Sequence, residues 1–524
     1  MTLHRRQLLK AAASLAAAGV ALPGIISARA QYKADPFSLG IASGEPASDG
    51  FVIWTKLAPE PFAFRGGMTP LPAEATFEVA TDPAMRQIVR TGVEITRIET
   101  AHSVHVELGG LEPARDYFYR FRAGGAESPV GRARTLPLPG ADVAQLRFVS
   151  AGCQSWEGGF YTAWRRIAEE ELDFVIHYGD YIYEQGYRAT WPNGQPVARP
   201  MPRDQAVCFT LTDYRRRYAL YKSDPDLKAA HAACPFFVSF DDHEVFDNWA
   251  GDRDQKRTPP EQFLFRRAAA FHAWYEHMPV RRSMIPRGPD MLAYRGFRFG
   301  NLADVAVLDT RQYRSAQPCG DGFKVCAEAD DPARTMLGEQ QERWLADRLR
   351  GEKGAWQVLA QQVLFSRLDF SPFEWVTSKA PGTHNLDAWD GASAARARVL
   401  GLLRDSRAAN PVVLTGDAHY GMAFEVKEDW NDPGSRSAAV EFLAPSISSN
   451  GDGARTLPNT EAILQLNPHL RYLGNERGYV RHSVTPKLWQ ADYRVLERVT
   501  TPDAPVLTRT SFTVEAGKPG LAGG

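Results

Sequence analysis

Cysteine is scarce in this chain, and charge of one sign does not dominate it. Only 5 of the 524 residues are cysteine, which excludes a small scaffold held together by many disulfides. The 61 basic side chains nearly balance the 62 acidic ones, so the net charge is −1. This balance argues against a specific nucleic-acid partner, because such binding depends on neutralising many phosphates.

Long apolar runs are also missing. The longest, residues 11–26, contains Pro23 and Gly24 and falls short of the roughly 20 apolar residues that a membrane-spanning helix needs. Hydrophobic residues still make up 44% of the chain, so large cores can form and sustained disorder is excluded. The length is compatible with two or three domains.

Residues 1–30 have the pattern of an export signal. Arg5 and Arg6 precede the apolar run, and Ala28 and Ala30 form an A-x-A-like cleavage site. The paired arginines resemble a twin-arginine signal, so we expect the twin-arginine (Tat) export machinery as a partner. The expected location is the periplasm or the exterior; a membrane anchor is the alternative. After cleavage we expect a monomer without a stable membrane span.

Residues 35–139 predict an all-β domain. Proline and glycine at 137–140 then predict a linker. The aromatic run at 117–121, which follows a turn, resembles the tyrosine corner of a fibronectin III or Ig-like sandwich. Period-two alternation and short apolar runs predict the strands of this domain at 51–55, 75–80 and 102–108.

Residues 145–515 alternate between strand and helix patterns, which indicates an α/β domain. The stretch 472–509 predicts further strands that close the second sheet. The other predicted strands are 146–153, 173–180, 236–240, 305–309, 356–360 and 411–417. The predicted helices are 161–171, 213–233, 339–350 and 393–407.

Several of these strands end in a potential metal ligand. Because ligands bind beyond the carboxyl ends of strands in α/β sheets, we expect the side chains there to converge. A turn or a helix cap would explain any single aspartate, but four strand ends in order favour a shared site. The four residues are Cys153, Asp180, Asp242 and Asp417.

The donor types predict two kinds of metal. A thiolate, a phenolate and an imidazole suit a transition metal, and the phenolate favours Fe³⁺. Carboxylates are hard oxygen ligands that suit Ca²⁺, with Asp180 as a bridge and Asn248 as a further ligand. The full expected ligand set is Cys153, Asp180, Tyr183, Asp242, Asn248, Asp417 and His419.

Four motifs carry a resemblance to a known family: SAGC at 150–153, HYGDYIYE at 177–184, DDHE at 241–244 and LTGDAH at 414–419. They resemble the calcineurin-like metallophosphoesterases, and within them the PhoD family of alkaline phosphatases and phosphodiesterases. The resemblance implies a two-sheet α/β/β/α sandwich with one Fe³⁺ and two Ca²⁺, whereas the residues alone leave one or two Ca²⁺ open. The chain departs from the general superfamily pattern, because Cys153, Asp242 and Asp417 stand where that pattern has Asp, Asn and His.

Two further residues are candidates for catalysis. We expect His243 to contact the leaving group or the phosphate, and Arg311 to clamp the phosphate through its planar guanidinium. The alternative for His243 is a core histidine that holds its loop through Glu244. The alternative for Arg311 is a structural ion pair with Asp309 or another carboxylate.

The expected function is therefore an exported, metal-dependent alkaline phosphatase or phosphodiesterase that hydrolyses phosphate esters with a metal-activated water. A phospholipase D that acts on phospholipid headgroups is the alternative within the same class. The second alternative is a binding protein whose catalytic domain has decayed. The sequence leaves the preferred ester and the number of calcium ions open.

The other cysteines and one loop complete the predictions. Cys319 and Cys326 enclose a short loop and predict a local disulfide in an exported protein. Cys208 and Cys234 predict either a second disulfide or two buried free thiols. The proline-rich segment 191–203 predicts a loop at the site entrance, with an ordinary surface excursion as the alternative.

Overall fold

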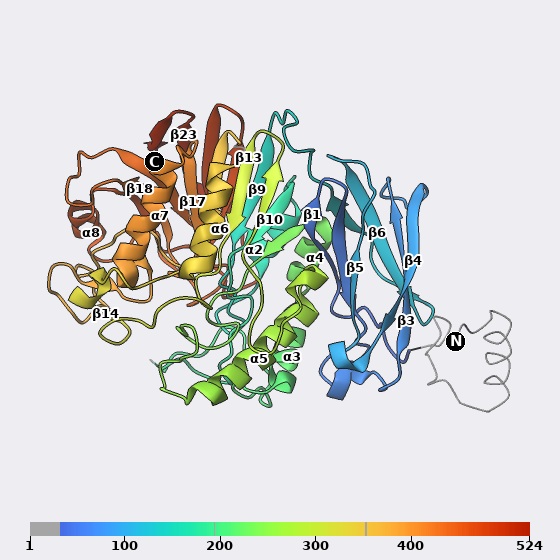
Figure 1. Ribbon diagram of the computed structural model, residues 1–524. Helices are drawn as coiled ribbons and strands as arrows, with labels where there is room; N and C mark the ends of the chain where they lie inside the picture. Colours follow the sequence, from blue (N-terminus) through green and yellow to red (C-terminus); the bar gives the residue numbers. More distant parts are fainter. Residues whose placement is uncertain (1–31, 193, 352–353) are drawn as a thin grey trace, which may run out of the picture.

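Two large β-sheets pack face to face in the computed structural model, which describes residues 32–192, 194–351 and 354–524 (Figure 1). The predicted α/β class is confirmed. The predicted export signal at 1–30 lies outside the described residues. The ten-stranded sheet has the order β24-β23-β22-β21-β9-β10-β11-β1-β2-β5, and the seven-stranded sheet the order β12-β13-β15-β17-β19-β18-β20.

The ten-stranded sheet is built around three parallel strands, β9 (Leu146–Ala151), β10 (Phe174–His177) and β11 (Phe236–Val238). These strands end next to the predicted metal ligands. The strands on either side of them are β21 (Arg477–Val484), β22 (Leu488–Leu496), β23 (Val506–Glu515), β24 (Lys518–Gly523), β1 (Ile41–Ala47), β2 (Gly50–Lys56) and β5 (Ser103–Glu107).

The seven-stranded sheet also has a parallel centre, which is formed by β13, β15, β17 and β19. Antiparallel strands flank this centre on both sides. Its strands are β12 (Arg295–Phe299), β13 (Ala303–Val307), β15 (Trp356–Ala360), β17 (Pro411–Thr415), β18 (Gly421–Lys427), β19 (Ser437–Leu443) and β20 (Leu470–Gly474).

The main core lies between the two sheets, where Phe148 and Phe174 of one sheet belong to the same buried cluster as Val305 and Val412 of the other. Helices α2 (Thr162–Ala168), α4 (Pro225–Ala233) and α5 (Pro260–His277) cover the outer face of the ten-stranded sheet. Helices α6 (Gly338–Arg350) and α7 (Ser393–Asp405) cover the other sheet. Among the described residues, no helix combines the length and apolar character that a membrane crossing requires.

The predicted helix at 213–233 is two helices, α3 (Leu211–Lys222) and α4. Proline cannot donate a backbone hydrogen bond, so Pro225 ends one helix and begins the next. Asp224 caps α4, because its carboxylate accepts the backbone N–H groups of Asp226 and Leu227. Helix α5 was not predicted from the sequence, and α8 (Thr460–Leu466) is short.

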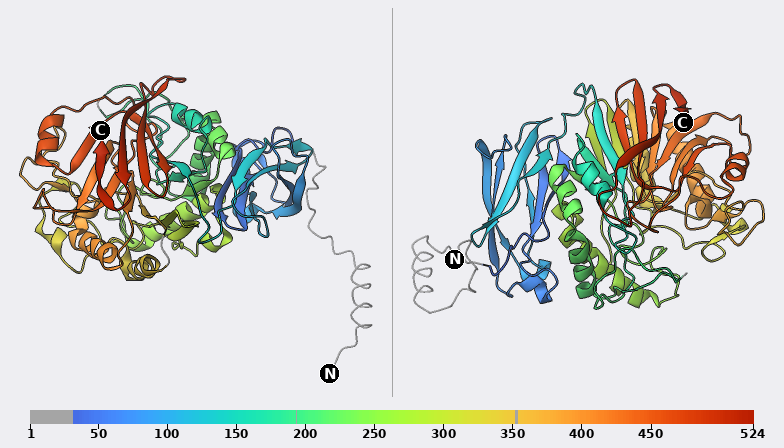
Figure 2. Two further views of the ribbon diagram at one scale, coloured as in Figure 1. Left: turned by 90° about the horizontal axis from the view of Figure 1, so that it is seen from above. Right: turned by 180° about the vertical axis from the view of Figure 1, so that it is seen from behind.

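The strands before residue 140 form a lobe of their own, drawn in blue in Figure 2. A five-stranded sheet packs on β1, β2 and β5, with Ile53, Val79 and Tyr119 in the shared core. However, β1 also pairs in parallel with β11, where Gly44 lies opposite Phe236, so this lobe continues the large sheet. The five strands are β3 (Ala73–Ala80), β4 (Ile88–Thr96), β6 (Asp116–Ala123), β7 (Ala126–Glu127) and β8 (Gly131–Arg134).

The C-terminal strands differ from the prediction. The stretch 472–509 is largely β-structure, but only β20 joins the seven-stranded sheet. Strand β21 pairs antiparallel with β9, where Val480 lies opposite Ser150, so β21 to β24 extend the ten-stranded sheet. The expectation that this stretch closes the second sheet was therefore wrong for most of its length.

The cysteine predictions have a mixed outcome. The Cys319–Cys326 disulfide is confirmed, with the two Cα atoms 6.1 Å apart. Cys208 and Cys234 are buried free thiols, so this alternative of the prediction is confirmed and a second disulfide between them is not formed. The two lie in different surroundings, because Cys208 is near the guanidinium groups of Arg217 and Arg266, whereas Cys234 is near Arg132 and Asp173.

A buried lysine at the end of α3 leads to a prediction about stability. The Lys222 ammonium lies 4.2 Å from the ring centre of Trp54, and burial, together with the charge of Lys56, lowers its pKa from 10.5 to about 7. Between these values the unfolded chain binds more protons, so the free energy of unfolding rises as the pH increases through this window. Below about pH 7 the Lys222 amine is charged in both the folded and the unfolded chain, so burial of this charge lowers the free energy of unfolding by its full amount.

We therefore expect Lys222→Met to raise the free energy of unfolding at pH 6 by about 2 kcal/mol, and by less at pH 9. Urea denaturation at the two pH values measures this difference, with the exposed Lys33→Met as the control. An equal effect of Lys222→Met at both pH values would contradict the assignment of a buried, titrating amine.

Candidate metal centre

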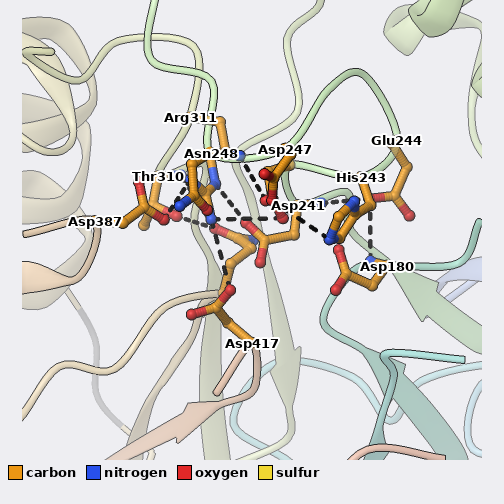
Figure 3. Close-up of polar contacts among 12 residues, drawn as sticks. Asp180, Asp241, His243, Glu244, Asp247, Asn248, Thr310, Arg311, Asp387 and Asp417 are labelled. Carbon is orange, nitrogen blue, oxygen red and sulfur yellow. Dashed lines mark hydrogen bonds and ion pairs between the residues drawn. The ribbon is translucent and has the colours of Figure 1, made fainter. Parts of the chain in front are cut away.

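The loops that follow β9, β10, β11 and β17 converge at one edge of the two sheets. Figure 3 shows residues from the loops after β10, β11 and β17. The backbone turns sharply there, because Cys153, Asp180 and Asp417 have φ angles of 52°, 55° and 65°. Gly179 has a φ of 134°, and a Cβ atom on it would lie 2.6 Å from the backbone nitrogen of Asp241. Only glycine fits at that position, which allows the β10 and β11 loops to approach each other.

The softer donors gather in one cluster. One ligand atom each of Cys153, Asp180 and His419 lies within 4.8 Å of the others. Tyr183 joins them, because its hydroxyl donates to Asp180 Oδ2 at 3.0 Å and lies 3.0 Å from His419 Nε2. The structure therefore brings together the four residues that the sequence predicts as ligands of the transition metal.

The carboxylates form two further clusters, one of which shares Asp180 with the first. Asp180, Asp242 and His243 form one, and Asp241, Asp242 and Asp417 form the other, each within 4.8 Å. The predicted trio of Asp180, Asp242 and Asp417 is therefore divided between them. Asp242 links the two clusters, and Asp241 is an acidic neighbour that the sequence analysis did not name as a ligand.

Asn248 lies beside the carboxylates. Its backbone N–H donates to Asp242 Oδ2 at 2.7 Å, and its side-chain amide donates to Asp321 Oδ2 at 2.8 Å. The amide group therefore lies between the β11 loop and the disulfide loop closed by Cys319 and Cys326. A role of its side-chain oxygen as a metal ligand stays a prediction.

Three buried carboxylate oxygens, Asp180 Oδ1, Asp241 Oδ2 and Asp242 Oδ1, make no hydrogen bond to any described residue. Unpaired buried oxygens are costly unless a cation or a donor compensates them. Burial, reinforced by neighbouring acids, raises the pKa of Asp180 and Asp417 well above the ordinary value. The donor set therefore fits cations, which would favour the ionised form of each ligand.

His243 stacks on Tyr183 with 4.2 Å between the ring centres, and its Nδ1 lies 2.8 Å from Glu184 Oε2. Although burial opposes the charge, Asp242 and Glu184 raise the pKa of His243 well above its usual range. Glu244 is not its partner. That carboxylate instead accepts the backbone N–H groups of Asp180 at 3.0 Å and Asp241 at 2.7 Å, which joins two site loops.

Arg311 is fully buried and held by ion pairs. Its Nε donates to Asp241 Oδ1 at 2.5 Å and its Nη1 to Asp387 Oδ2 at 2.8 Å. The predicted alternative, an ion pair with a carboxylate, is therefore present, but not with Asp309, which accepts the backbone N–H of Arg311 at 2.9 Å. The Nη2 atom makes no hydrogen bond to the described residues and lies 3.7 Å from Asp242 Oδ1.

Two site residues escaped the sequence analysis because they are not typical metal ligands. Ser449 Oγ lies 2.6 Å from Tyr183 Oη and donates to the backbone oxygen of Cys153 at 2.7 Å. Asn450 Nδ2 lies 2.9 Å from His419 Nδ1. Both follow β19, so the end of a further parallel strand was the available signal.

Part of the proline-rich segment 191–203, at Ala198 and Arg199, packs against the loop that follows Cys153. The guanidinium of Arg199 lies 3.3 Å from the ring centre of Trp156, and the backbone N–H of Ala198 donates to the carbonyl of Glu157 at 3.1 Å. The predicted role of this segment at the site entrance stays a prediction.

Comparison with known proteins agrees with this geometry. Residues 148–493 match the PhoD-like phosphatase family, and residues 24–137 match the N-terminal domain of PhoD-like phosphatases. The chain belongs to the PhoD-like phosphatase family. It is 46% identical over 499 residues to alkaline phosphatase D of Bacillus subtilis (strain 168). The matched region covers 95% of this chain and 84% of that protein.

A solved structure of PhoD has the same fold. It superposes with a TM-score of 0.90 and 46% sequence identity, over 94% of this chain and 93% of that chain. The predicted phosphoesterase function is confirmed by these similarities, and this PhoD-like protein is a phosphoric ester hydrolase. The alternative of a binding protein without catalytic activity is set aside.

Proposed function

We propose that this PhoD-like phosphatase depends on one Fe³⁺ and one or two Ca²⁺. Cys153, Asp180, Tyr183 and His419 would hold the iron, since a thiolate, a phenolate and an imidazole gather there. The carboxylates would hold calcium. The calcium ligands in this proposal are Asp180, Asp242, Asn248 and Asp417, with Asp241 added by its position.

One observation carries the proposal: buried carboxylate oxygens from separate strand ends face one another without hydrogen bonds from the described residues. Bound cations supply two kinds of chemistry at such a site, namely neutralisation of phosphate charge and a lower pKa for a bound water. The protein side chains then orient the ester and move protons.

For His243 we propose proton donation to the leaving oxygen. Glu184 fixes the Nδ1 side of the ring, which leaves Nε2 as the donating atom. For Arg311 we propose phosphate contact through Nη2 alone, because its other nitrogens are taken by Asp241 and Asp387. The ion pair between Arg311 Nε and Asp241 also holds the Asp241 carboxylate in position.

The role of His243 can be tested by substitution. We expect His243→Gln to lower kcat about 100-fold, because general acid catalysis contributes on this order. Iron and calcium contents measured by elemental analysis should stay at the wild-type level. The control is His272→Gln in α5, outside the clusters. Loss of metal in His243→Gln would instead make His243 a metal ligand.

Removal of the metals tests the proposed function directly. We expect about one iron and one or two calcium ions per chain, and at least about 100-fold loss of phosphatase activity after chelation. Activity should return when iron and calcium are added together. Full activity of a protein freed of both metals would overturn the proposal.

The preferred ester separates the remaining alternatives. We propose that phosphomonoesters and phosphodiesters are substrates, and p-nitrophenyl phosphate, its bis ester and phosphatidylcholine are the test compounds. Hydrolysis of phosphatidylcholine alone would favour the phospholipase D alternative. The family assignment supports a phosphate ester as substrate.

We further propose residues 1–30 as a twin-arginine signal, with a periplasmic or secreted monomer as the product. The domains would be residues 35–139, fibronectin III or Ig-like, and residues 145–515, a metallophosphoesterase sandwich. The arginine pair supports the first proposal. The packed sheets and the β-rich lobe support the second, although β1 belongs to both parts.

A further inference from the structure

A group of aromatic side chains adjoins the proposed iron site. Tyr420 follows His419 in the chain, and its ring centre lies 6.2 Å from that of Phe373. The ring centre of Trp375 lies 5.8 Å from that of Phe373. We refer to this group as the aromatic wall, and its members are Phe323, Phe370, Phe373, Trp375 and Tyr420.

The members of the aromatic wall differ in exposure, because Phe323 and Tyr420 are partly buried. Phe370 and Phe373 are buried, whereas the side chain of Trp375 is 48% exposed. The exposed indole is nevertheless held in place. Its ring centre lies 4.7 Å from that of Phe323 and 6.2 Å from that of Phe370, so neighbouring rings pack against it. A fixed and half-exposed indole offers a rigid surface for a ligand.

The disulfide loop connects the aromatic wall to the metal centre. Phe323 lies in β14 (Phe323–Lys324), and its ring meets that of Trp375 edge-on, with 4.7 Å between the centres. Asp321 of the same loop accepts the amide of Asn248, a proposed calcium ligand. The loop is closed by Cys319 and Cys326, and β14 pairs with β16 (His384–Asn385).

The aromatic wall is therefore connected to the metal centre at two places in the chain. Tyr420 extends from His419, and Phe323 extends from the loop that touches Asn248. A phosphate ester bound at the metal centre carries its alcohol part several ångströms away from the phosphorus atom. A planar ring at that distance can stack on an indole, since aromatic side chains favour such contacts over water.

We propose that Trp375 and its aromatic neighbours form a binding subsite for a planar ring on the alcohol part of the substrate. The substrate class is a phosphate ester of an aromatic or heteroaromatic alcohol. This inference rests on the proposed function, because it places the phosphate at the metal centre. The subsite contributes to binding through stacking and leaves the chemical step to the metal-centre residues.

Binding of two phosphonates to the full metal-loaded chain tests this subsite without turnover. We expect phenylphosphonate to bind about 5- to 10-fold more tightly than methylphosphonate, as one aromatic contact allows. In Trp375→Ala this preference should disappear while the affinity for methylphosphonate is unchanged. The ratio of kcat/KM for phenyl phosphate to that for methyl phosphate should fall by the same factor.

Two variants serve as controls. Trp375→Phe keeps a ring and should retain most of the preference, which separates stacking from simple disruption of the fold. Phe64→Ala removes an aromatic side chain that is 74% exposed but belongs to the N-terminal lobe, and it should change nothing. An unchanged phenyl preference in Trp375→Ala would overturn the subsite, as would absence of phosphonate binding to the wild-type chain.

The same measurements separate the subsite from the proposed metal function. If the phenyl preference depends on Trp375 but activity survives complete metal removal, the subsite stands and the metal function fails. If activity depends on the metals but Trp375→Ala keeps the wild-type preference, the metal function stands and the subsite fails.

Discussion

Replacing Asp180 by Asn is expected to lower phosphatase activity at least about 1000-fold and to remove both kinds of metal. Asp180 is the residue that belongs both to the cluster with Cys153 and His419 and to the cluster with Asp242 and His243. An amide has nearly the same shape but no negative charge, so both clusters lose a shared ligand. Elemental analysis and p-nitrophenyl phosphate hydrolysis measure the two effects.

The same variant should have an opposite effect on the metal-free protein. Burial, with the nearby charges of Asp242 and Asp241, raises the pKa of Asp180 well above its ordinary value, although His243 opposes this. Removing that carboxylate should therefore raise the free energy of unfolding of the chelated protein by about 1 kcal/mol. Urea denaturation with and without metals distinguishes a ligand from a structural residue.

Asp304 provides a matched control. It is a buried carboxylate on β13, and it forms ion pairs with Arg348 at 2.7 Å and Arg298 at 3.1 Å, outside the metal clusters. Asp304→Asn should lose stability, because it removes the charge of a buried carboxylate that pairs with two half-buried guanidinium groups, while it keeps its metals and activity. Equal metal contents in Asp180→Asn and wild type would contradict the bridging role of Asp180.

Replacing Tyr183 by Phe is expected to abolish a visible absorption band of the purified protein. The band would arise from a tyrosinate bound to Fe³⁺, and Tyr183 is the tyrosine whose hydroxyl lies 3.0 Å from both Asp180 Oδ2 and His419 Nε2. Activity should fall about 100-fold, since a ligand is lost without a change of shape. Absorption spectra and initial rates measure the two effects.

Tyr181 is the matched control for this substitution. It is buried two residues away, but its hydroxyl lies 2.8 Å from His231 Nε2, outside the metal clusters. Tyr181→Phe should keep the band and the activity. If Tyr183→Phe kept the band, iron would be bound without the phenolate, and the proposed ligand set would be wrong.

Much of the site could be predicted because its signals are local. An apolar strand that ends in a polar residue is visible in a few residues, and Cys153, Asp180, Asp242 and Asp417 were found in this way. The geometry of parallel strands then predicted that these residues converge. Ser449 and Asn450 also follow a parallel strand, β19, but serine and asparagine after a strand are ordinary turn residues and do not by themselves mark a metal site.

The surroundings of the two catalytic candidates could not be predicted. The partner of His243 is Glu184, which is 59 residues away in sequence, rather than the adjacent Glu244. The partners of Arg311 are Asp241 and Asp387, 70 and 76 residues away. Sequence proximity suggests the nearest acid, whereas packing of separate loops selects the acid that is nearest in space.

The sequence by itself determined the α/β class, the family, the local disulfide and the chemical types of the converging donors. Only the tertiary structure decided that β1 joins β11, that β21 joins β9, and that Cys208 and Cys234 stay apart. The physical reason is the range of the interactions. Hydrophobic periodicity and turn chemistry act over a few neighbouring residues, while strand pairing and buried ion pairs depend on the packing of the whole chain.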